Sequence, residues 1–121
     1  LIRGICAVQP GIKGVSENIV VKSVLGRFLE HSRIYHFING GDDEYWIGSA
    51  DLMGRNLDRR VESLVMVQRK EHHVRLQSLL DLGLSEETSS WQLKETTWSR
   101  PNKKGLTNVH AELIEHYSKD R

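Results

Sequence analysis

Cysteine, proline and long apolar runs are scarce in this sequence of 121 residues, which holds one cysteine and two prolines. With Cys6 alone, no disulfide can form within the chain, and a reducing compartment is the natural setting. We expect the thiol of Cys6 to be buried and inert, because it lies in an apolar run. No run approaches the roughly 20 apolar residues that a membrane-spanning helix needs, and no signal-like segment opens the chain. A cytoplasmic location is therefore expected.

The sequence also lacks an excess of charge of one sign. Lysine and arginine number 17, aspartate and glutamate 16, and the formal net charge is +1. This balance argues against a general nucleic-acid binder, which carries bulk positive charge. Any positive charge that matters for function must be local.

The length is that of a single domain, 1–121, able to bury a core but small for a complete enzyme with several substrates. The chain starts on Leu1 rather than methionine, and a strand-like run begins there without a leader, which indicates a piece of something longer. Strand patterns followed by helical patterns predict an α/β domain. No internal repeat or second domain is apparent.

The predicted elements follow from apolar periodicity and from turn and cap residues. Helices are expected at 68–82, stopped by Gly83, and from Asn108, a candidate N-cap, to Ser118. Residues 52–58 look irregular, and the run at 61–67 alternates like a central strand. The remaining expected strands are 1–8, 19–25, 33–38, 44–48 and a small hairpin of 91–93 with 96–98.

The stretch from 26 to 60 concentrates residue types that bind phosphate. The strand patterns at 33–38 and 44–48 flank Asn39-Gly40-Gly41-Asp42-Asp43, a turn signal that predicts a β-hairpin. His31 precedes the first strand, while Asp51, Asn56 and several arginines follow the second. The hairpin should return both sets to one end, and an imidazole beside guanidiniums suits phosphate binding.

Each candidate also has a purely structural interpretation. His31 can be a hydrogen-bonding residue beneath the hairpin, and Arg3 can reach solvent or a carboxylate instead of an anion. Arg60 can pair with Asp58 or Glu62, and Arg33 with Glu30 or Glu44. His36 falls on the opposite face of the strand from His31, and the adjacent His72 and His73 lack ligands at metal-site spacing.

His31 and Arg33, with Gly48-Ser49-Ala50-Asp51 after the turn, loosely follow the His-x-Lys and Gly-Ser segments of the phospholipase D superfamily. Arg33, Ile38 and Leu52 replace that motif's lysine, aspartate and asparagine. Longer strings closely resemble the C-terminal catalytic domain of bacterial polyphosphate kinase, type 1. They are Arg-Gly-Ile-Cys at 3–6, Ser-Glu-Asn-Ile at 16–19, Gly-Arg-Phe-Leu-Glu-His-Ser-Arg-Ile-Tyr at 26–35 and Gly-Ser-Ala-Asp-Leu-Met-Gly-Arg-Asn-Leu-Asp-Arg-Arg-Val-Glu at 48–62.

The resemblance implies a phospholipase D-like α/β fold, with a mixed β-sheet flanked by helices. It implies an enzyme that reversibly moves the γ-phosphate of ATP to inorganic polyphosphate through a phosphohistidine outside these residues. By position, Arg3 and Arg60 would bind phosphate, and His31 would be a second active-site histidine that contacts nucleotide phosphate and assists proton transfer. Arg33, Arg55 and Asn56 are further candidate phosphate ligands.

The same resemblance implies ATP and ADP as substrates, Mg²⁺ held by residues outside this chain, and a homo-oligomeric full protein. The isolated chain is expected to be inactive, because the remaining domains of the parent chain carry the phosphohistidine. Neither nucleic acid nor a transmembrane segment is expected, and any membrane association would be peripheral, at the inner face. Two alternatives remain: a non-catalytic polyanion-binding module that uses Arg3, Arg33 and Arg60, and a phospholipase D-like phosphodiesterase, whose lysine is absent here.

Overall fold

The computed structural model describes residues 1–3 and 6–119. The chain separates into two compact units, one made of residues 1–30 and 80–121 and the other of residues 31–79. Helix α2 (Lys70–Leu84) begins in the second unit and ends in the first. Strands and helices are both present, so the predicted α/β class is confirmed, but the strands form two antiparallel sheets rather than one mixed sheet.

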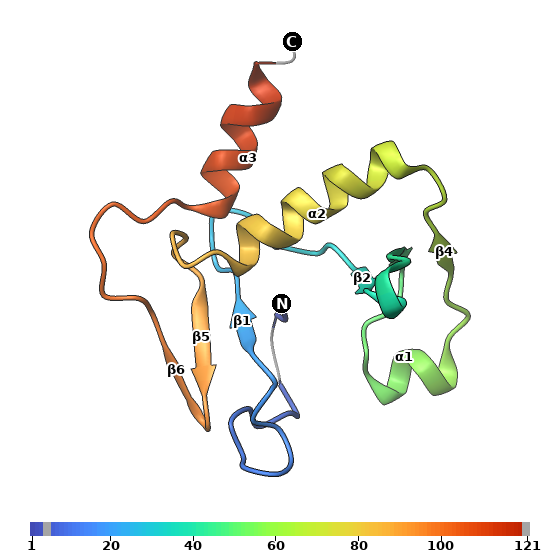
Figure 1. Cartoon of the computed structure of the whole chain (residues 1–121), viewed down its shortest axis with the longest axis horizontal. Coiled ribbons are helices and arrows are strands. Elements are labelled where there is room, and N and C mark those ends of the chain that lie inside the picture. Colours follow the sequence, from blue (N-terminus) through green and yellow to red (C-terminus); the bar gives the residue numbers. More distant parts are fainter. Residues whose placement is uncertain (4–5, 120–121) are drawn as a thin grey trace. The chain divides into compact units, whose positions relative to one another are not determined.

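The first unit is built on a sheet in the order β1-β5-β6, with β1 (Val21–Ser23), β5 (Trp91–Lys94) and β6 (Thr97–Ser99) side by side (Figure 1). Val21 pairs with Leu93, which in turn pairs with Trp98, so the predicted tryptophan hairpin is confirmed. Among its described residues, the buried apolar side chains are those of Val21, Val24, Leu93 and Val109. They lie in β1, just after it, in β5 and at the first residue of α3 (Val109–Ser118).

Helix α3 begins where the sequence predicted it. The side chain of Asn108 accepts the N–H of Ala111 at 3.1 Å, which satisfies one of the donors left unpaired at a helix start. In the first turn His110 is 5% exposed, and its Nδ1 accepts the N–H of Phe28 at 3.2 Å. Gly26 allows this close approach, because a Cβ there would lie 2.3 Å from His110 Nδ1.

Two expectations near the N-terminus were wrong in part. Residues 1–3 and 6–8 form no strand, and Gly4 and Ile5 lie outside the described residues. The N–H of Ile2 donates to the carbonyl of Lys22 at 2.9 Å, but one such bond does not make a ladder. Cys6 is half-buried rather than buried. Its Sγ donates to the backbone carbonyl of Val8 at 3.2 Å.

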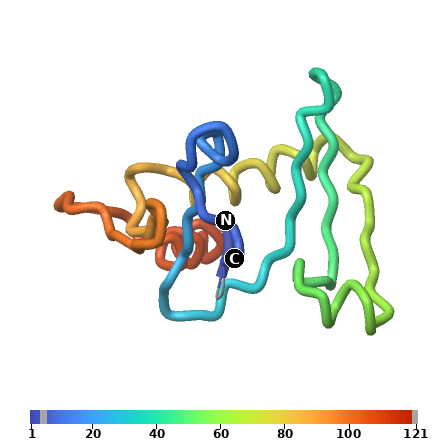
Figure 2. The backbone as a smooth tube through the Cα atoms, turned by 90° about the horizontal axis from the view of Figure 1, so that it is seen from below, coloured from blue at the N-terminus to red at the C-terminus, as the bar shows by residue number. Residues whose placement is uncertain are grey.

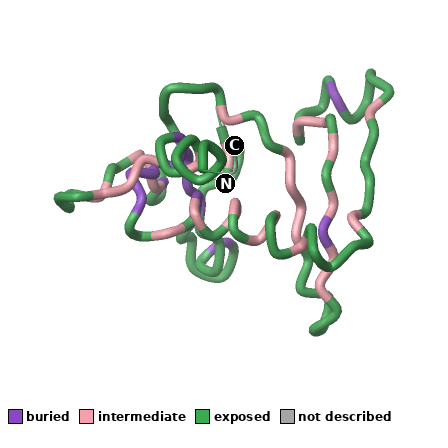
Figure 3. The backbone as a smooth tube through the Cα atoms, turned by 90° about the horizontal axis from the view of Figure 1, so that it is seen from above, coloured by how far each residue is buried: buried purple, intermediate pink, exposed green. Residues whose placement is uncertain are grey.

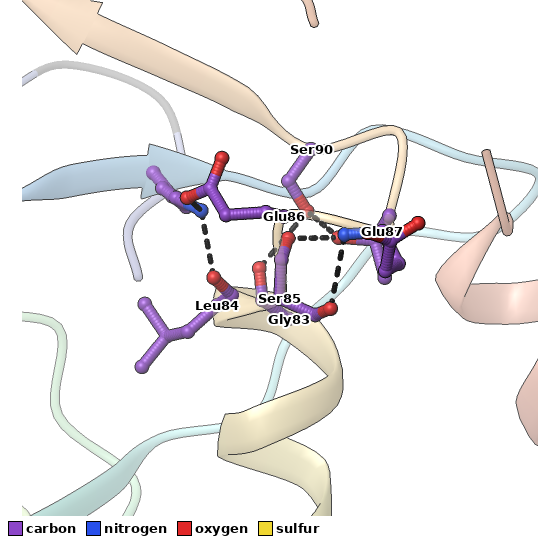
Figure 4. A network of polar contacts seen from close by, with 8 residues as sticks. Gly83, Leu84, Ser85, Glu86, Glu87 and Ser90 are labelled. Carbon is purple, nitrogen blue, oxygen red and sulfur yellow. Dashed lines mark hydrogen bonds and ion pairs between the residues drawn. The ribbon is translucent and has the colours of Figure 1, made fainter. Parts of the chain in front are cut away.

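The C-terminal end of α2 is held by side chains from elsewhere in the first unit (Figure 4). The carbonyl of Gly83 accepts Ser90 Oγ at 2.9 Å, and that of Leu84 accepts Lys22 Nζ at 2.7 Å. Lys22 is 5% exposed and also pairs with Glu86. Gly83 does not stop the helix as predicted. It lies inside the last turn, where a Cβ would come within 2.5 Å of Leu1 Cδ1.

The second unit contains the predicted hairpin. β2 (Ile34–Phe37) and β3 (Glu44–Gly48) pair antiparallel, with Ile34 opposite Ile47, around the short 3-10 helix η1 (Asn39–Gly41). Gly40 and Gly41 have φ of 69° and 102°, the positive values that the turn signal predicted. β4 (Leu64–Met66) pairs with β3, and the three strands run beside one another (Figure 2).

Two predictions for this unit were wrong. β4 is not central but forms the edge of the order β2-β3-β4, and it is exposed along its length (Figure 3). Residues 52–58 are not irregular, because α1 (Gly54–Arg59) forms there, and the N–H groups of Asn56 and Leu57 donate to the carbonyl of Met53. Six residues are too few to show a helical period in the sequence.

Tyr45 is the buried centre of the second unit, at 4% exposed. Its ring stacks on His36 with centroids 4.2 Å apart, and His73 of α2 lies against it at 4.6 Å. Its hydroxyl donates to the side chain of Gln77. His36 also pairs with Asp43, and His73 is a packed histidine, with Nε2 against the carbonyl of Val67.

Candidate active site at the open end of the hairpin

The hairpin returns its two flanking segments to one place, as the sequence predicted. The N–H of Gly48 donates to the carbonyl of Arg33 at 3.1 Å, which continues the ladder beyond β2. The hydroxyl of Tyr35 then donates to the carbonyl of Ala50 at 3.2 Å. These bonds set Asp51 beside Arg33, with Nε and Nη2 of the guanidinium both 2.9 Å from Asp51 Oδ1.

The same guanidinium lies against His31. Nη1 is 3.0 Å from the imidazole Nδ1, Nη2 is 3.0 Å from Nε2, and Nη1 also reaches the backbone carbonyl of His31 at 3.4 Å. A neutral imidazole has one acceptor nitrogen, so at most one of the two N···N contacts is a hydrogen bond. His31 itself is exposed, which leaves its ring accessible to a ligand.

Asp51 is ionised in this arrangement. The hydrogen bond from Arg33 is the main cause that lowers the pKa of its carboxyl, with smaller contributions from the Asn56 side chain and from His31. Asn56 is 2% exposed in α1, and among the described residues its Oδ1 has no hydrogen-bond partner. The site thus combines a carboxylate, a guanidinium, an imidazole and a buried amide.

The structure brings together some of the predicted site residues. His31 contacts Arg33, and the side chains of Arg33 and Asn56 both act on Asp51. Arg55 lies in α1 and Arg60 directly follows it, both exposed. Within the described residues neither has a hydrogen bond or ion pair. Arg3 belongs to the other unit, where it is exposed.

The ion-pair partners considered for the arginines were wrong. Arg33 pairs with Asp51 rather than with Glu30 or Glu44, and Glu62 accepts the hydroxyl of Ser49 rather than pairing with Arg60. Asp51 was absent from the predicted site set. Its signal was its place just past the second strand of the hairpin, where the chain returns to His31.

The described residues offer no metal centre and no membrane span. No group of three or more histidine, cysteine, aspartate or glutamate side chains is placed to hold an ion within residues 1–3 and 6–119. Over the same residues, none of the helices combines the length and apolar character that crossing a bilayer requires.

Comparison with known proteins gives one consistent result. A family model described as "Polyphosphate kinase C-terminal domain 2" matches residues 1–112. Over 119 residues the chain is 51% identical to a polyphosphate kinase of Streptomyces coelicolor, covering 94% of this chain and 16% of that protein. A polyphosphate kinase of Mycobacterium tuberculosis is 54% identical over 93 residues, covering 77% and 12%.

A solved structure agrees with the sequence matches. The crystal structure of polyphosphate kinase from Porphyromonas gingivalis superimposes with a TM-score of 0.82 at 28% identity, covering 97% of this chain and 18% of that one. The chain therefore spans less than a fifth of the relatives that it matches.

Proposed function

This chain belongs to the polyphosphate kinase C-terminal domain 2 family, and on that premise we propose that it supplies part of the active site of an ATP:polyphosphate phosphotransferase. The enzyme would move the γ-phosphate of ATP reversibly onto inorganic polyphosphate, through a phosphohistidine outside these 121 residues. The observation that carries the proposal is the exposed imidazole of His31, held by Arg33 at the open end of the hairpin.

The chemistry suits the residues. Phosphoryl transfer asks the protein for positioning and for stabilisation of negative charge on the phosphoryl oxygens. An imidazole, with an ordinary pKa of about 6.5, can take up or release a proton near neutral pH. His31 would therefore contact nucleotide phosphate and assist proton transfer, beside guanidiniums that stabilise the transferred charge.

The candidate phosphate ligands differ in their exposure and in the contacts that they make. Arg60 and Arg55 are exposed and, among the described residues, unpaired, so their N–H groups are available to phosphate oxygens. Arg3 takes its role as a nucleotide phosphate ligand from its position in the Arg-Gly-Ile-Cys string. Asn56, buried with an unpaired Oδ1, is a weaker candidate, because an amide oxygen does not donate to phosphate.

Several parts of the proposal concern the parent protein. The family resemblance implies Mg²⁺ held by residues outside this chain, and no step here depends on it. ATP as the donor implies a cytoplasmic enzyme, with at most peripheral contact with the inner membrane face. Self-association of the full protein and the adjoining domains of the parent chain complete the expected partners.

The test uses a full-length polyphosphate kinase that carries this sequence as its domain. His31→Ala should abolish phosphate transfer from ATP to polyphosphate, while far-UV circular dichroism stays unchanged. His72→Ala is the matched control, because His72 is an exposed histidine of α2 outside the site. Full transfer activity in His31→Ala would refute the proposal. Polyphosphate binding without transfer in the wild-type enzyme would favour the binding-module alternative.

A further inference from the structure

The guanidinium of Arg33 faces other groups of the site. Its Nε donates to Asp51 Oδ1, and Nη2 lies 2.9 Å from the same oxygen and 3.0 Å from Nε2 of His31. Nη1 lies 3.0 Å from Nδ1 of His31 and 3.4 Å from its backbone carbonyl. A neutral imidazole accepts at one nitrogen, so at most one of the two ring contacts is a hydrogen bond. The Arg33 side chain is also only 18% exposed, so its contacts are internal to the site.

We propose that Asp51 is a positioning residue, which anchors the guanidinium of Arg33 so that Arg33 fixes the imidazole of His31. In this arrangement Arg33 acts on His31 and not on phosphate. The consequence for phosphate transfer rests on the proposed function above, whereas the orientation of His31 can be tested without it.

Asp51 is itself held firmly enough to serve as an anchor. The N–H of Met53 donates to the Asp51 carbonyl at 2.7 Å, and the N–H of Asn56 donates to the carbonyl of Met53 at 2.9 Å. The backbone of Asp51 is thus tied to the start of α1, while that of Arg33 is tied to the ladder of the hairpin. The lowered pKa of Asp51 agrees with a carboxylate that stays charged beside the guanidinium.

The pairing has a definite effect on the imidazole. The guanidinium lies 3.0 Å from both ring nitrogens, so a fixed Arg33 restricts the imidazole to one orientation and keeps a donor beside whichever nitrogen accepts. Without Asp51, Arg33 keeps its charge but loses the contact that sets its side-chain angle. His31 would then sample several orientations, and fewer of them would be productive for transfer.

The first experiment uses this chain alone and observes the imidazole nitrogens of His31 by long-range ¹H–¹⁵N correlation NMR. Nitrogen shifts of His31 that differ from those of a free imidazole are expected in the wild type, and shifts that move toward the free values are expected in Asp51→Asn. Asp58→Asn is the control, because it makes the same chemical change at an exposed carboxylate of α1. A His31 spectrum in Asp51→Asn identical to that of the wild type would overturn the inference.

The second experiment measures kinetics in the full-length enzyme. Asp51→Asn should lower kcat by about tenfold to a hundredfold, the scale of a misplaced catalytic group, with KM for ATP nearly unchanged. Asp51→Glu should lower kcat less than Asp51→Asn does. The control Asp58→Asn should have the wild-type kcat. If Asp51→Asn does not fold, the Arg33→Lys variant is measured instead. Lysine keeps the positive charge but cannot contact Asp51 and His31 at the same time. An unchanged kcat in whichever of these two variants folds would refute the inference.

The outcomes separate the two proposals. If His31→Ala leaves transfer intact, the proposed function fails, whatever the spectra of the chain show. If His31→Ala abolishes transfer and Asp51→Asn does not affect it, only the positioning role fails.

Discussion

Replacing Lys22 with methionine tests how the end of α2 is held. Lys22 is a buried cation whose Nζ donates to the carbonyl of Leu84 at 2.7 Å and pairs with Glu86, whose side chain is 76% exposed. Methionine keeps most of the apolar stem but removes the charge and its donors. The carbonyl of Leu84 then lacks its donor at the C-terminal end of a helix, where a cation is favoured.

The change in the free energy of unfolding follows from the hydrogen bond and charge that Lys22→Met removes and from the release of Glu86. Leaving a buried acceptor unsatisfied costs about 1–3 kcal/mol, and the low end applies here because the bond to Leu84 is only part-buried. The loss of the cation from the helix end adds about 0.3–1 kcal/mol. The freed Glu86 rehydrates at little cost because it is already exposed, and the ammonium no longer needs desolvation, which offsets part of the loss. We expect the free energy of unfolding to fall by about 2 kcal/mol in total.

The assay is urea unfolding followed by amide NMR intensities of the first unit. With a slope of about 1–3 kcal/mol per molar urea, the midpoint should fall by roughly 1 M at an unchanged slope. Glu86→Gln is the control, and a much smaller change is expected because that carboxylate is exposed. A Lys22→Met chain as stable as the wild type would mean that the Lys22 contact is dispensable.

Three further outcomes are expected. Gly26→Ala should destabilise the first unit by about 1–3 kcal/mol in urea unfolding, because the added Cβ overlaps the buried ring of His110. Asn108→Ala should cost about 1 kcal/mol and increase amide exchange in the first turn of α3, since the N-cap acceptor is lost. The depressed pKa of Asp51 means that the Arg33 pair stabilises the fold above the ordinary carboxyl pKa of about 3.9, and that this contribution is lost as pH falls through the lower folded value, which a ¹³C carboxyl titration would follow.

Both substitutions have matched controls. Gly54→Ala adds a Cβ at ordinary contact distance, 3.4 Å from Asp58 Oδ2, and should be tolerated. Asn102→Ala removes an exposed loop amide and should leave α3 unchanged. Wild-type stability in Gly26→Ala would contradict the close approach to His110. Unchanged exchange in Asn108→Ala would contradict the N-cap bond to Ala111. An Asp51 carboxyl that titrates at its ordinary pKa would contradict the pair with Arg33.

The sequence predicted the elements whose signals are local. The hairpin followed from the turn residues at 39–43, and the start of α3 from Asn108, because turns and caps depend on a few adjacent side chains. Helix α1 was missed because six residues carry no usable period.

Partners distant in the sequence were harder to predict. For Arg33 the carboxylates considered lay within eleven residues, yet the hairpin register brings Asp51 from eighteen residues away. The burial of Lys22 depends on α2, whose end lies more than sixty residues later. Contacts of this kind depend on tertiary packing, which local patterns do not encode.

The contacts of Tyr45 with two imidazoles allow the position of α2 to be followed by NMR. His36 lies opposite Tyr45 in the hairpin, whereas His73 comes from α2, so the ring current of Tyr45 falls on the protons of His73 only while the helix rests on the sheet. A displaced imidazole C–H resonance of His73 would therefore report the docking of α2, without a label and without the tryptophans. The His36 resonance would report the hairpin itself, so the two signals together would show which of these contacts a titration disturbs.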